Sequence, residues 1–249
     1  MWCCVGTGME NHGKYGQFIY THTGNSLFVN LYTASQLDWK ERGITLRQET
    51  DFPYGESSKI TIVDGKSEFT LQVRYPGWVH PGEFKVSVNG KPVEIVTGPS
   101  SYLGISRKWK KGDVVNIDFP MHSSLRYLPN ETQYIAIMHG PIMLGMKTGT
   151  EDMASLIADD SRFGQYAGGK KLPVNEAPIL INNDIASIAS QLKPIAGKPL
   201  HFTLSTHMVN KIEGELQPFF EIHDSRYMMY WLALTEKIYN QHIDNMARQ

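Results

Sequence analysis

Alternation of apolar and polar residues, interrupted by short glycine-containing turns, is the feature of this sequence that most restricts its fold. Between residues 26 and 119, apolar side chains recur at every second position in several short runs, as in Leu27, Val29 and Leu31. A period of two places every other side chain on the same face of a strand. Turn signals separate these runs at intervals of about ten residues, a spacing typical of a β-sandwich.

Two dipeptides indicate hairpin turns within this region. They are Asp64-Gly65 and Asn89-Gly90, and each lies between two alternating runs. Asp-Gly and Asn-Gly tolerate the positive φ angles that a two-residue hairpin turn requires. The sequence therefore predicts a hairpin at each dipeptide. Further strands are predicted at residues 115–119, 134–138, 200–204, 219–222 and 227–232.

Helical patterns occur at both ends of the chain. Thr7 and Glu10 have the spacing of a capping box, in which a Thr at the cap is followed three residues later by Glu. This predicts a helix over residues 8–22, ended by Gly24. The capping box explains Glu10 without a functional role, although a carboxylate there could also belong to a site. A second helix is predicted over residues 235–248.

Composition excludes several classes of protein. The chain of 249 residues contains 24 Lys and Arg against 25 Asp and Glu, for a formal net charge of -1. This balance argues against a nucleic-acid partner, which usually requires a basic excess. No stretch approaches the roughly 18 apolar residues of a membrane span. The N-terminus also lacks the basic start and apolar run of a signal peptide.

The two cysteines are adjacent, at Cys3 and Cys4. A disulfide between neighbours is disfavoured because the intervening peptide must distort. Two thiols beside a helix N-terminus can ionise and bind a soft metal such as zinc. Two small buried apolar residues would explain the pair equally well. No spaced pair of Cys or His completes a four-ligand zinc site, so further ligands would have to lie elsewhere.

Residues 3–12 resemble the signature of the β-L-arabinofuranosidase glycoside hydrolases, families 127 and 146. Other segments resemble these families in the same order, and the resemblance covers essentially the whole chain. These segments are Arg74-Tyr75-Pro76-Gly77-Trp78, Val88-Asn89-Gly90, Trp109-Lys110-Lys111-Gly112-Asp113, His139-Gly140-Pro141 and Pro218-Phe219-Phe220-Glu221-Ile222-His223-Asp224-Ser225-Arg226-Tyr227.

The resemblance implies an (α/α)₆ barrel that carries the active site, followed by two β-sandwich domains. It also implies a retaining mechanism with a zinc-bound Cys nucleophile and a Glu acid/base, the zinc being held by three Cys and one Glu. By motif match, Cys3 corresponds to the nucleophile and Cys4 to a zinc ligand, so both would contact the metal. The third Cys and both Glu precede the double Cys in the family, where this chain has only Met1 and Trp2.

We therefore expect a mostly β chain with three parts. Residues 1–25 are expected to be a short helical remnant of the barrel, residues 26–125 the first β-sandwich, and residues 126–249 a second β-sandwich with a long irregular segment and a C-terminal helix. Without the rest of the barrel, Cys3 and Cys4 are expected to be reactive and near the surface. The first dozen residues are then expected to be mobile, to pack against another copy of the chain, or to pack onto the sandwich.

Two functions remain open. In the first, the chain is the C-terminal part of a retaining glycoside hydrolase of carbohydrate metabolism that acts on plant-type glycans. It would be inactive by itself, with zinc bound only in the intact enzyme and a periplasmic or secreted location. In the second, it is a non-catalytic β-sandwich module that binds carbohydrate or supports a partner.

Two further groups of residues have both structural and binding interpretations. Aromatic residues on the predicted strands usually fill a core, but several on one exposed face would stack on sugars. Asn182-Asn183-Asp184 and Asp159-Asp160 offer oxygen ligands suited to calcium, without the spacing of an EF-hand loop. The aromatic residues are Tyr75, Trp78, Tyr102, Trp109, Tyr227 and Trp231.

Overall fold

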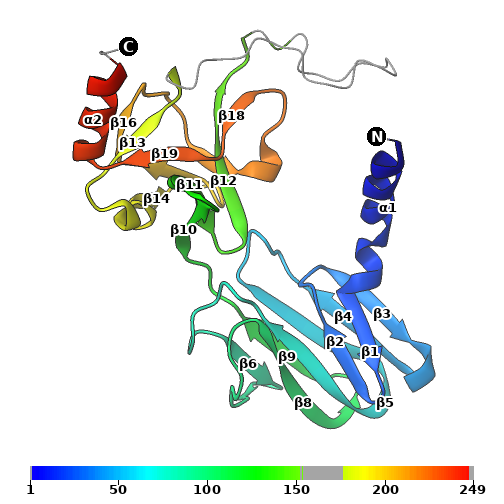
Figure 1. Ribbon diagram of the computed structural model, residues 1–249. Coiled ribbons are helices and arrows are strands. Elements are labelled where there is room, and N and C mark those ends of the chain that lie inside the picture. The colour runs from blue at the N-terminus through cyan, green and yellow to red at the C-terminus, as the bar shows by residue number, and fades with distance from the viewer. Residues whose placement is uncertain (1, 152, 154–175, 247–249) are drawn as a thin grey trace. The chain divides into compact units, whose positions relative to one another are not determined.

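The computed structural model of the chain describes residues 2–151, 153 and 176–246 (Figure 1). It separates into two compact units, Met1–Met121 and His122–Gln249. Strands predominate in both units, which confirms the mostly β class. Much of the irregular segment that the sequence predicts in the second unit lies outside the described residues.

The first unit consists of one helix followed by a sheet of nine strands. In the sheet, β1-β2-β5-β9-β6-β7 form a continuous path, β3 pairs with β4, and both β4 and β8 pair with β5. The elements are α1 (Trp2–Ile19), β1 (Tyr20–Thr23), β2 (Ser26–Val29), β3 (Ser35–Trp39), the 3₁₀ turn η1 (Lys40–Arg42), β4 (Ile44–Glu49), β5 (Ser57–Tyr75), β6 (Lys85–Val88), β7 (Lys91–Pro92), β8 (Ser101–Lys110) and β9 (Val114–Asp118).

The strand β5 is 19 residues long and runs straight through Asp64-Gly65, so the hairpin predicted there is wrong. Its first half pairs with β4 and β9, and its second half pairs with β2 and β8. The register with β4 shifts next to Asp64, and Gly65 has a φ of 88°. Glycine adopts the positive φ found here within a strand as readily as it does in a turn, which is why the dipeptide misled the prediction.

The Asn89-Gly90 hairpin is confirmed. The two residues join β6 to β7, Val88 pairs with Lys91, and the φ angles are 51° and 78°. Both angles are positive, as a two-residue type I′ turn requires.

Valine in place of Gly90 should lower the free energy of unfolding by more than about 1 kcal/mol, because a β-branched residue resists positive φ. A Cβ at Gly90 would meet nothing within 4 Å, so the backbone angle alone carries the expected loss. Gly98→Val is the matched control, since a Cβ there also meets nothing within 4 Å and its φ is not positive. Chemical denaturation would measure both variants, and equal losses would contradict the role of the turn.

The core of the first unit contains residues from both halves of β5, including Ile60, Ile62, Leu71 and Val73. The two parts of the sheet thus enclose one core, as the two layers of a β-sandwich do. Trp109 is fully buried in this core, and its indole Nε1 donates a hydrogen bond to the carbonyl oxygen of Phe69 at 3.1 Å.

The second unit is built on a sheet of ten strands with the path β14-β15-β17-β12-β11-β19-β13-β16, to which β10 and β18 are added. Its largest core lies around Trp231, Ile137 and Leu216. The elements are β10 (Ser123–Leu128), β11 (Glu131–His139), β12 (Ile142–Gly149), β13 (Ile179–Ile181), the 3₁₀ helix η3 (Ile185–Gln191), β14 (Leu192–Pro194), β15 (Phe202–Leu204), β16 (His207–Val209), β17 (Leu216–Pro218), the 3₁₀ turn η4 (Phe219–Glu221), β18 (Arg226–Met228), β19 (Trp231–Leu234) and α2 (Glu236–Met246).

Two further predicted elements differ from the structure, the strand predicted at residues 227–232 is divided between β18 and β19, and the C-terminal helix is confirmed as α2. The first helix begins at Trp2, not near residue 8, so Thr7 lies inside it and the capping box is wrong. It ends at Ile19 because the next four residues form β1, which turns back onto β2 through Gly24 at a φ of 54°. The predicted strand at residues 219–222 is mostly the 3₁₀ turn η4.

Candidate functional site

Cys3 and Cys4 lie at the N-terminal end of α1. Their side chains are outside the described part of the structure. The roles of nucleophile and zinc ligand, and the reactivity of the thiols, therefore stay predictions.

The described side chains of α1 leave large apolar groups exposed. Met9 is 71% exposed, Tyr15 50% and Phe18 58%. Glu10 forms an exposed ion pair with Lys14 at 3.3 Å, an i,i+4 contact of the kind that stabilises a helix by a few tenths of a kcal/mol. Glu10 thus has a structural partner on its own helix.

Two of the motifs that carry the family resemblance meet at one end of the first unit. Asn89 Nδ2 donates to Asp113 Oδ1 at 2.8 Å, and the backbone N–H of Lys110 donates to Asp113 Oδ2 at 3.0 Å. The N–H of Val114 donates to Asn89 Oδ1 at 2.8 Å. These contacts join the β6–β7 turn to the turn between β8 and β9, so both motifs have a structural role in this unit.

The Asp113 carboxyl is almost completely buried, with 2% of the side chain exposed. Burial by itself would raise its pKa, but the hydrogen bonds from Asn89 and Lys110, together with the charge of Arg107, lower the pKa below the usual value. The carboxylate is therefore held in its charged form inside the fold.

Most of the aromatic residues considered for sugar stacking belong to cores. Tyr75, Trp109 and Trp231 are buried. The Trp78 ring stacks on Phe52 with 5.9 Å between the ring centroids. Tyr227 is 48% exposed. The six residues do not form one exposed face, which favours the structural interpretation.

A polar groove of about 450 Å³ lies on the first unit, where β4, β5 and β9 run side by side. Glu49 and Lys59 form an ion pair at 3.3 Å within it, and both side chains are about half exposed. Because donors and acceptors are mixed along its walls, the groove has the chemistry to bind hydroxyl groups. Its lining residues are Glu49, Thr50, Asp51, Gly55, Ser57, Ser58, Lys59, Asn116 and Asp118.

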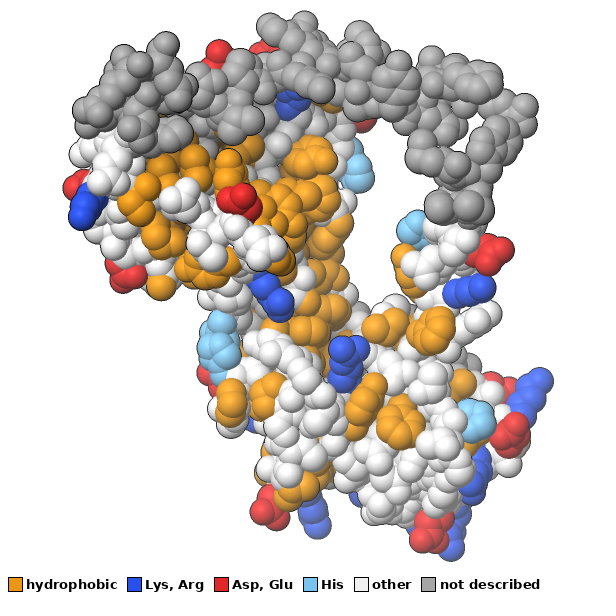
Figure 2. All heavy atoms as spheres, in the orientation of Figure 1, with side chains coloured by type: hydrophobic (Ala, Val, Ile, Leu, Met, Phe, Trp, Pro, Cys, Tyr) orange, Lys and Arg blue, Asp and Glu red, His pale blue; other side chains and the backbone are white. Residues whose placement is uncertain are grey.

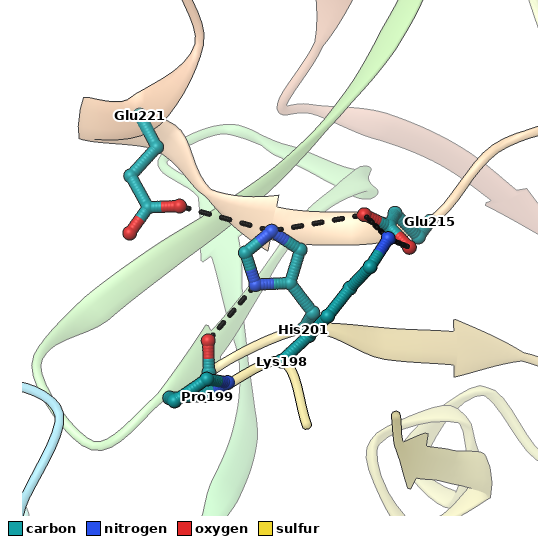
Figure 3. Close-up of polar contacts among 5 residues, drawn as sticks. All are labelled: Lys198, Pro199, His201, Glu215 and Glu221. Carbon is teal, nitrogen blue, oxygen red and sulfur yellow. Dashed lines mark hydrogen bonds and ion pairs between the residues drawn. The ribbon is translucent and has the colours of Figure 1, made fainter. Parts of the chain in front are cut away.

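A cluster of charged side chains on the second unit surrounds His201 (Figure 3). The His201 Nε2 atom lies 3.7 Å from Glu215 Oε1 and 3.7 Å from Glu221 Oε2. Lys198 Nζ lies 2.9 Å from both carboxylate oxygens of Glu215. His201 Nδ1 lies 2.9 Å from the carbonyl oxygen of Pro199.

Sequence reasoning missed the His201 cluster. His201, Glu215 and Glu221 are separated by 14 and 6 positions in the sequence, and this spacing matches no known metal-binding motif. They meet because Phe202 of β15 pairs with Leu216 of β17, next to His201 and Glu215. Only a prediction of strand pairing could have shown this.

The two Asn side-chain oxygens considered for calcium in residues 182–184 have structural partners. Asn183 Oδ1 accepts the backbone N–H of Glu236 at the start of α2, at 3.1 Å. Asn182 Oδ1 accepts the N–H of Asp184 at 2.9 Å. These contacts favour a turn and a helix cap over a calcium loop. Asp159-Asp160 lies outside the described residues.

Charged side chains of both signs are interspersed on the face drawn in Figure 2. Among the described residues, no helix has the length and apolar character needed to cross a bilayer.

Comparison with protein families assigns a domain to each unit. Residues 26–121 match the family model of the middle domain of GH127 β-L-arabinofuranosidases. Residues 124–233 match the model of a domain of unknown function, DUF4986. No protein of curated function matches the chain.

Several solved structures share the fold. A GH127 β-arabinofuranosidase matches with a TM-score of 0.61 and 24% identity over 87% of this chain and 36% of its own. A GH127 β-L-arabinofuranosidase from Geobacillus stearothermophilus T6 matches with a TM-score of 0.57 and 21% identity over 88% of this chain and 35% of its own. A glycoside hydrolase matches with a TM-score of 0.58 and 21% identity over 86% of this chain and 37% of its own. The chain thus spans about a third of the length of the structures it matches.

Proposed function

We propose that this chain, which carries a GH127 middle domain at residues 26–121, forms the C-terminal β part of a retaining β-L-arabinofuranosidase that acts on plant-type glycans in the periplasm or outside the cell. The observation that carries the proposal is the family match, which spans nearly all the strands of the first unit. The likeness of fold to two GH127 enzymes over most of the chain supports it.

In this proposal Cys3 attacks the anomeric carbon and Cys4 holds zinc. The donor set fits zinc in its chemistry, since thiolates are preferred zinc ligands, and the two residues would supply two of the usual four. A bound zinc would keep the Cys3 sulfur ionised at neutral pH. Cys3 and Cys4 are neighbours near the N-terminal end of α1.

A retaining glycosidase needs a second group, which protonates the leaving oxygen opposite the nucleophile. The family resemblance matches no residue of this chain to that acid/base Glu. Glu10, the one carboxylate of α1, pairs with Lys14. The acid would come from the helical barrel of the enzyme.

The purified chain is therefore expected to show no turnover of an aryl β-L-arabinofuranoside, because general acid catalysis alone contributes about 10²–10⁴-fold. Chromogenic substrate hydrolysis would measure this, with Cys3→Ala as the matched control. Turnover that disappears in Cys3→Ala would show that the chain holds a complete site.

The same preparation distinguishes the second function, a non-catalytic carbohydrate-binding module. The polar groove between β4, β5 and β9 is the feature that supports it. An affinity gel containing immobilised arabinan is expected not to retard the chain, because the proposal assigns substrate contacts to the barrel. Retardation without turnover would favour the binding module.

A further inference from the structure

We propose that Asn30 is a positioning residue for the double cysteine, because it fixes the end of the helix that carries Cys3 and Cys4. The inference rests on the proposed function, in which these two residues are the nucleophile and a zinc ligand. Asn30 directly follows β2, and α1 runs from Trp2 to Ile19 and leads straight into β1 (Figure 1).

Packing of side chains contributes little to the position of α1. Every residue from Gly6 to Phe18 is exposed, and Ile19 is partly buried. The helix is therefore held to the first unit mainly at its C-terminal end. The last four carbonyl groups of a helix have no partner within it, so this end needs hydrogen-bond donors from elsewhere in the chain.

Asn30 supplies donors to the last two carbonyl groups of α1. Its side-chain Nδ2 donates to the carbonyl oxygen of Phe18 at 3.1 Å, and its backbone N–H donates to that of Ile19 at 2.9 Å. The same Nδ2 donates to Thr21 Oγ1 of β1 at 3.0 Å. A carbonyl oxygen can only accept a hydrogen bond, so the contact with Phe18 also fixes which way the amide group faces.

Two other strands hold Asn30 itself. The Tyr102 hydroxyl of β8 donates to Asn30 Oδ1 at 2.7 Å, and Arg74 Nη1 of β5 donates to the Asn30 carbonyl oxygen at 3.2 Å. The Tyr102 ring also packs against the Phe28 ring of β2, with 5.2 Å between the ring centroids. One residue thus ties the end of α1 to β2, β5 and β8, in which β5 pairs with both of the others.

The length of the helix makes this anchor important for the cysteines. Cys3 precedes Ile19 by 16 residues in α1, which is about 24 Å along the helix axis. A tilt of about 5° at the anchored end would then move the backbone of Cys3 by about 2 Å. A displacement of about 1 Å at a reacting group can reduce a rate by about 10²-fold, so a catalytic cysteine on α1 needs this end to be rigid.

Distances between two spin labels test the anchor in the full chain, with Cys3→Ser and Cys4→Ser removing the native thiols. One label is attached at Gly6→Cys, near the double cysteine, where a Cβ meets nothing within 4 Å. The other is attached at Glu68→Cys, an exposed position of β5. We expect this parent to give a single narrow distribution of distances.

Asn30→Ala should lose the narrow distribution, because both side-chain donations to α1 and β1 disappear. Asn116→Ala, at an exposed Asn of β9 in the same unit, is the matched control and should keep the parent distribution. Thermal melting would confirm that each variant is folded. A broader distribution in a folded variant then reports the orientation of α1 and not unfolding of the unit.

Two further variants isolate the amide group. Asn30→Asp keeps an acceptor for Tyr102 but removes both donations, so its distribution should be as broad as that of Asn30→Ala. Tyr102→Phe removes only the hydroxyl that holds the amide and should also broaden the distribution. It decides the test if Asn30→Ala does not fold, because the buried part of its ring is retained.

A parent that is already broad, a parent-like distribution in folded Asn30→Ala, or equal broadening in Asn116→Ala would overturn the proposal. Where only Tyr102→Phe folds, a parent-like distribution in that variant would overturn it. None of these results depends on hydrolysis of a glycoside, so they leave the glycosidase assignment to the turnover experiment.

Discussion

Alanine in place of Trp109 is expected to lower the free energy of unfolding of the first unit by about 3–5 kcal/mol. The indole is fully buried, and its ring centroid lies 5.9 Å from that of Phe69. Its N–H also donates a hydrogen bond to the Phe69 carbonyl. Truncation would leave a cavity between the two parts of the sheet and remove the hydrogen bond to the Phe69 carbonyl. Urea denaturation, with fluorescence and circular dichroism compared, would measure the loss.

Val96→Ala is the control for this experiment. Val96 belongs to the same unit but is 75% exposed, so its truncation should change stability by less than about 0.5 kcal/mol. A Trp109→Ala variant as stable as Val96→Ala would show that the core is not arranged as described.

Alanine in place of Asp113 should cost the first unit about 3 kcal/mol at neutral pH, because hydrogen bonds to a buried carboxylate are strong and the substitution takes this acceptor away from two donors. Those donors are the Asn89 amide and the Lys110 N–H. Asp64→Ala is the matched control, since that side chain is 76% exposed and only 3.8 Å from Lys111, a contact of little energetic value.

Acidification provides an independent measurement of the same carboxylate. Because folding lowers the pKa of Asp113, the unfolded chain binds its proton more readily. Its contribution to stability is therefore complete above about pH 4, the ordinary value of an Asp, and is lost as the pH falls through the lower value of the folded state. Denaturation at pH 7 and at pH 3 should show a smaller acid-induced loss in Asp113→Ala than in the parent chain. Equal losses in both would contradict the lowered pKa.

The strands of the first unit were predictable because apolar and polar side chains alternate along a half-buried strand. The buried residues of the core follow that alternation. The Asx-Gly dipeptides did not by themselves show where the chain turns back. Asn89-Gly90 forms the predicted hairpin, whereas Asp64-Gly65 forms a bulge within β5. Gly65 and Gly90 both have positive φ, so the outcome depends on which strand lies alongside each of them. At Gly65, a Cβ would meet the carbonyl oxygen of Gly43 at 1.9 Å, a contact that no local pattern reveals.

Candidate sites could likewise be predicted only where their residues are close together in the sequence. The double Cys could be recognised because its residues are adjacent, while the His201 cluster arises from strands that meet only after folding. Asp113 belongs to a motif of the resemblance, yet its hydrogen bond with Asn89 could not be read from the sequence. The two residues are 24 positions apart and meet through the pairing of β6 with β9.

The long strand β5 also has a consequence for the order in which the first unit folds. Its partners β2, β4, β8 and β9 come from both earlier and later parts of the chain, and β5 pairs with each of them. Because this one continuous strand belongs to both parts of the sheet, we expect the two parts to open together. Backbone amides on both sides of Gly65 should exchange with deuterium at similar, slow rates through complete opening of the unit. Because contacts so distant in sequence close slowly, refolding should take milliseconds to seconds rather than microseconds.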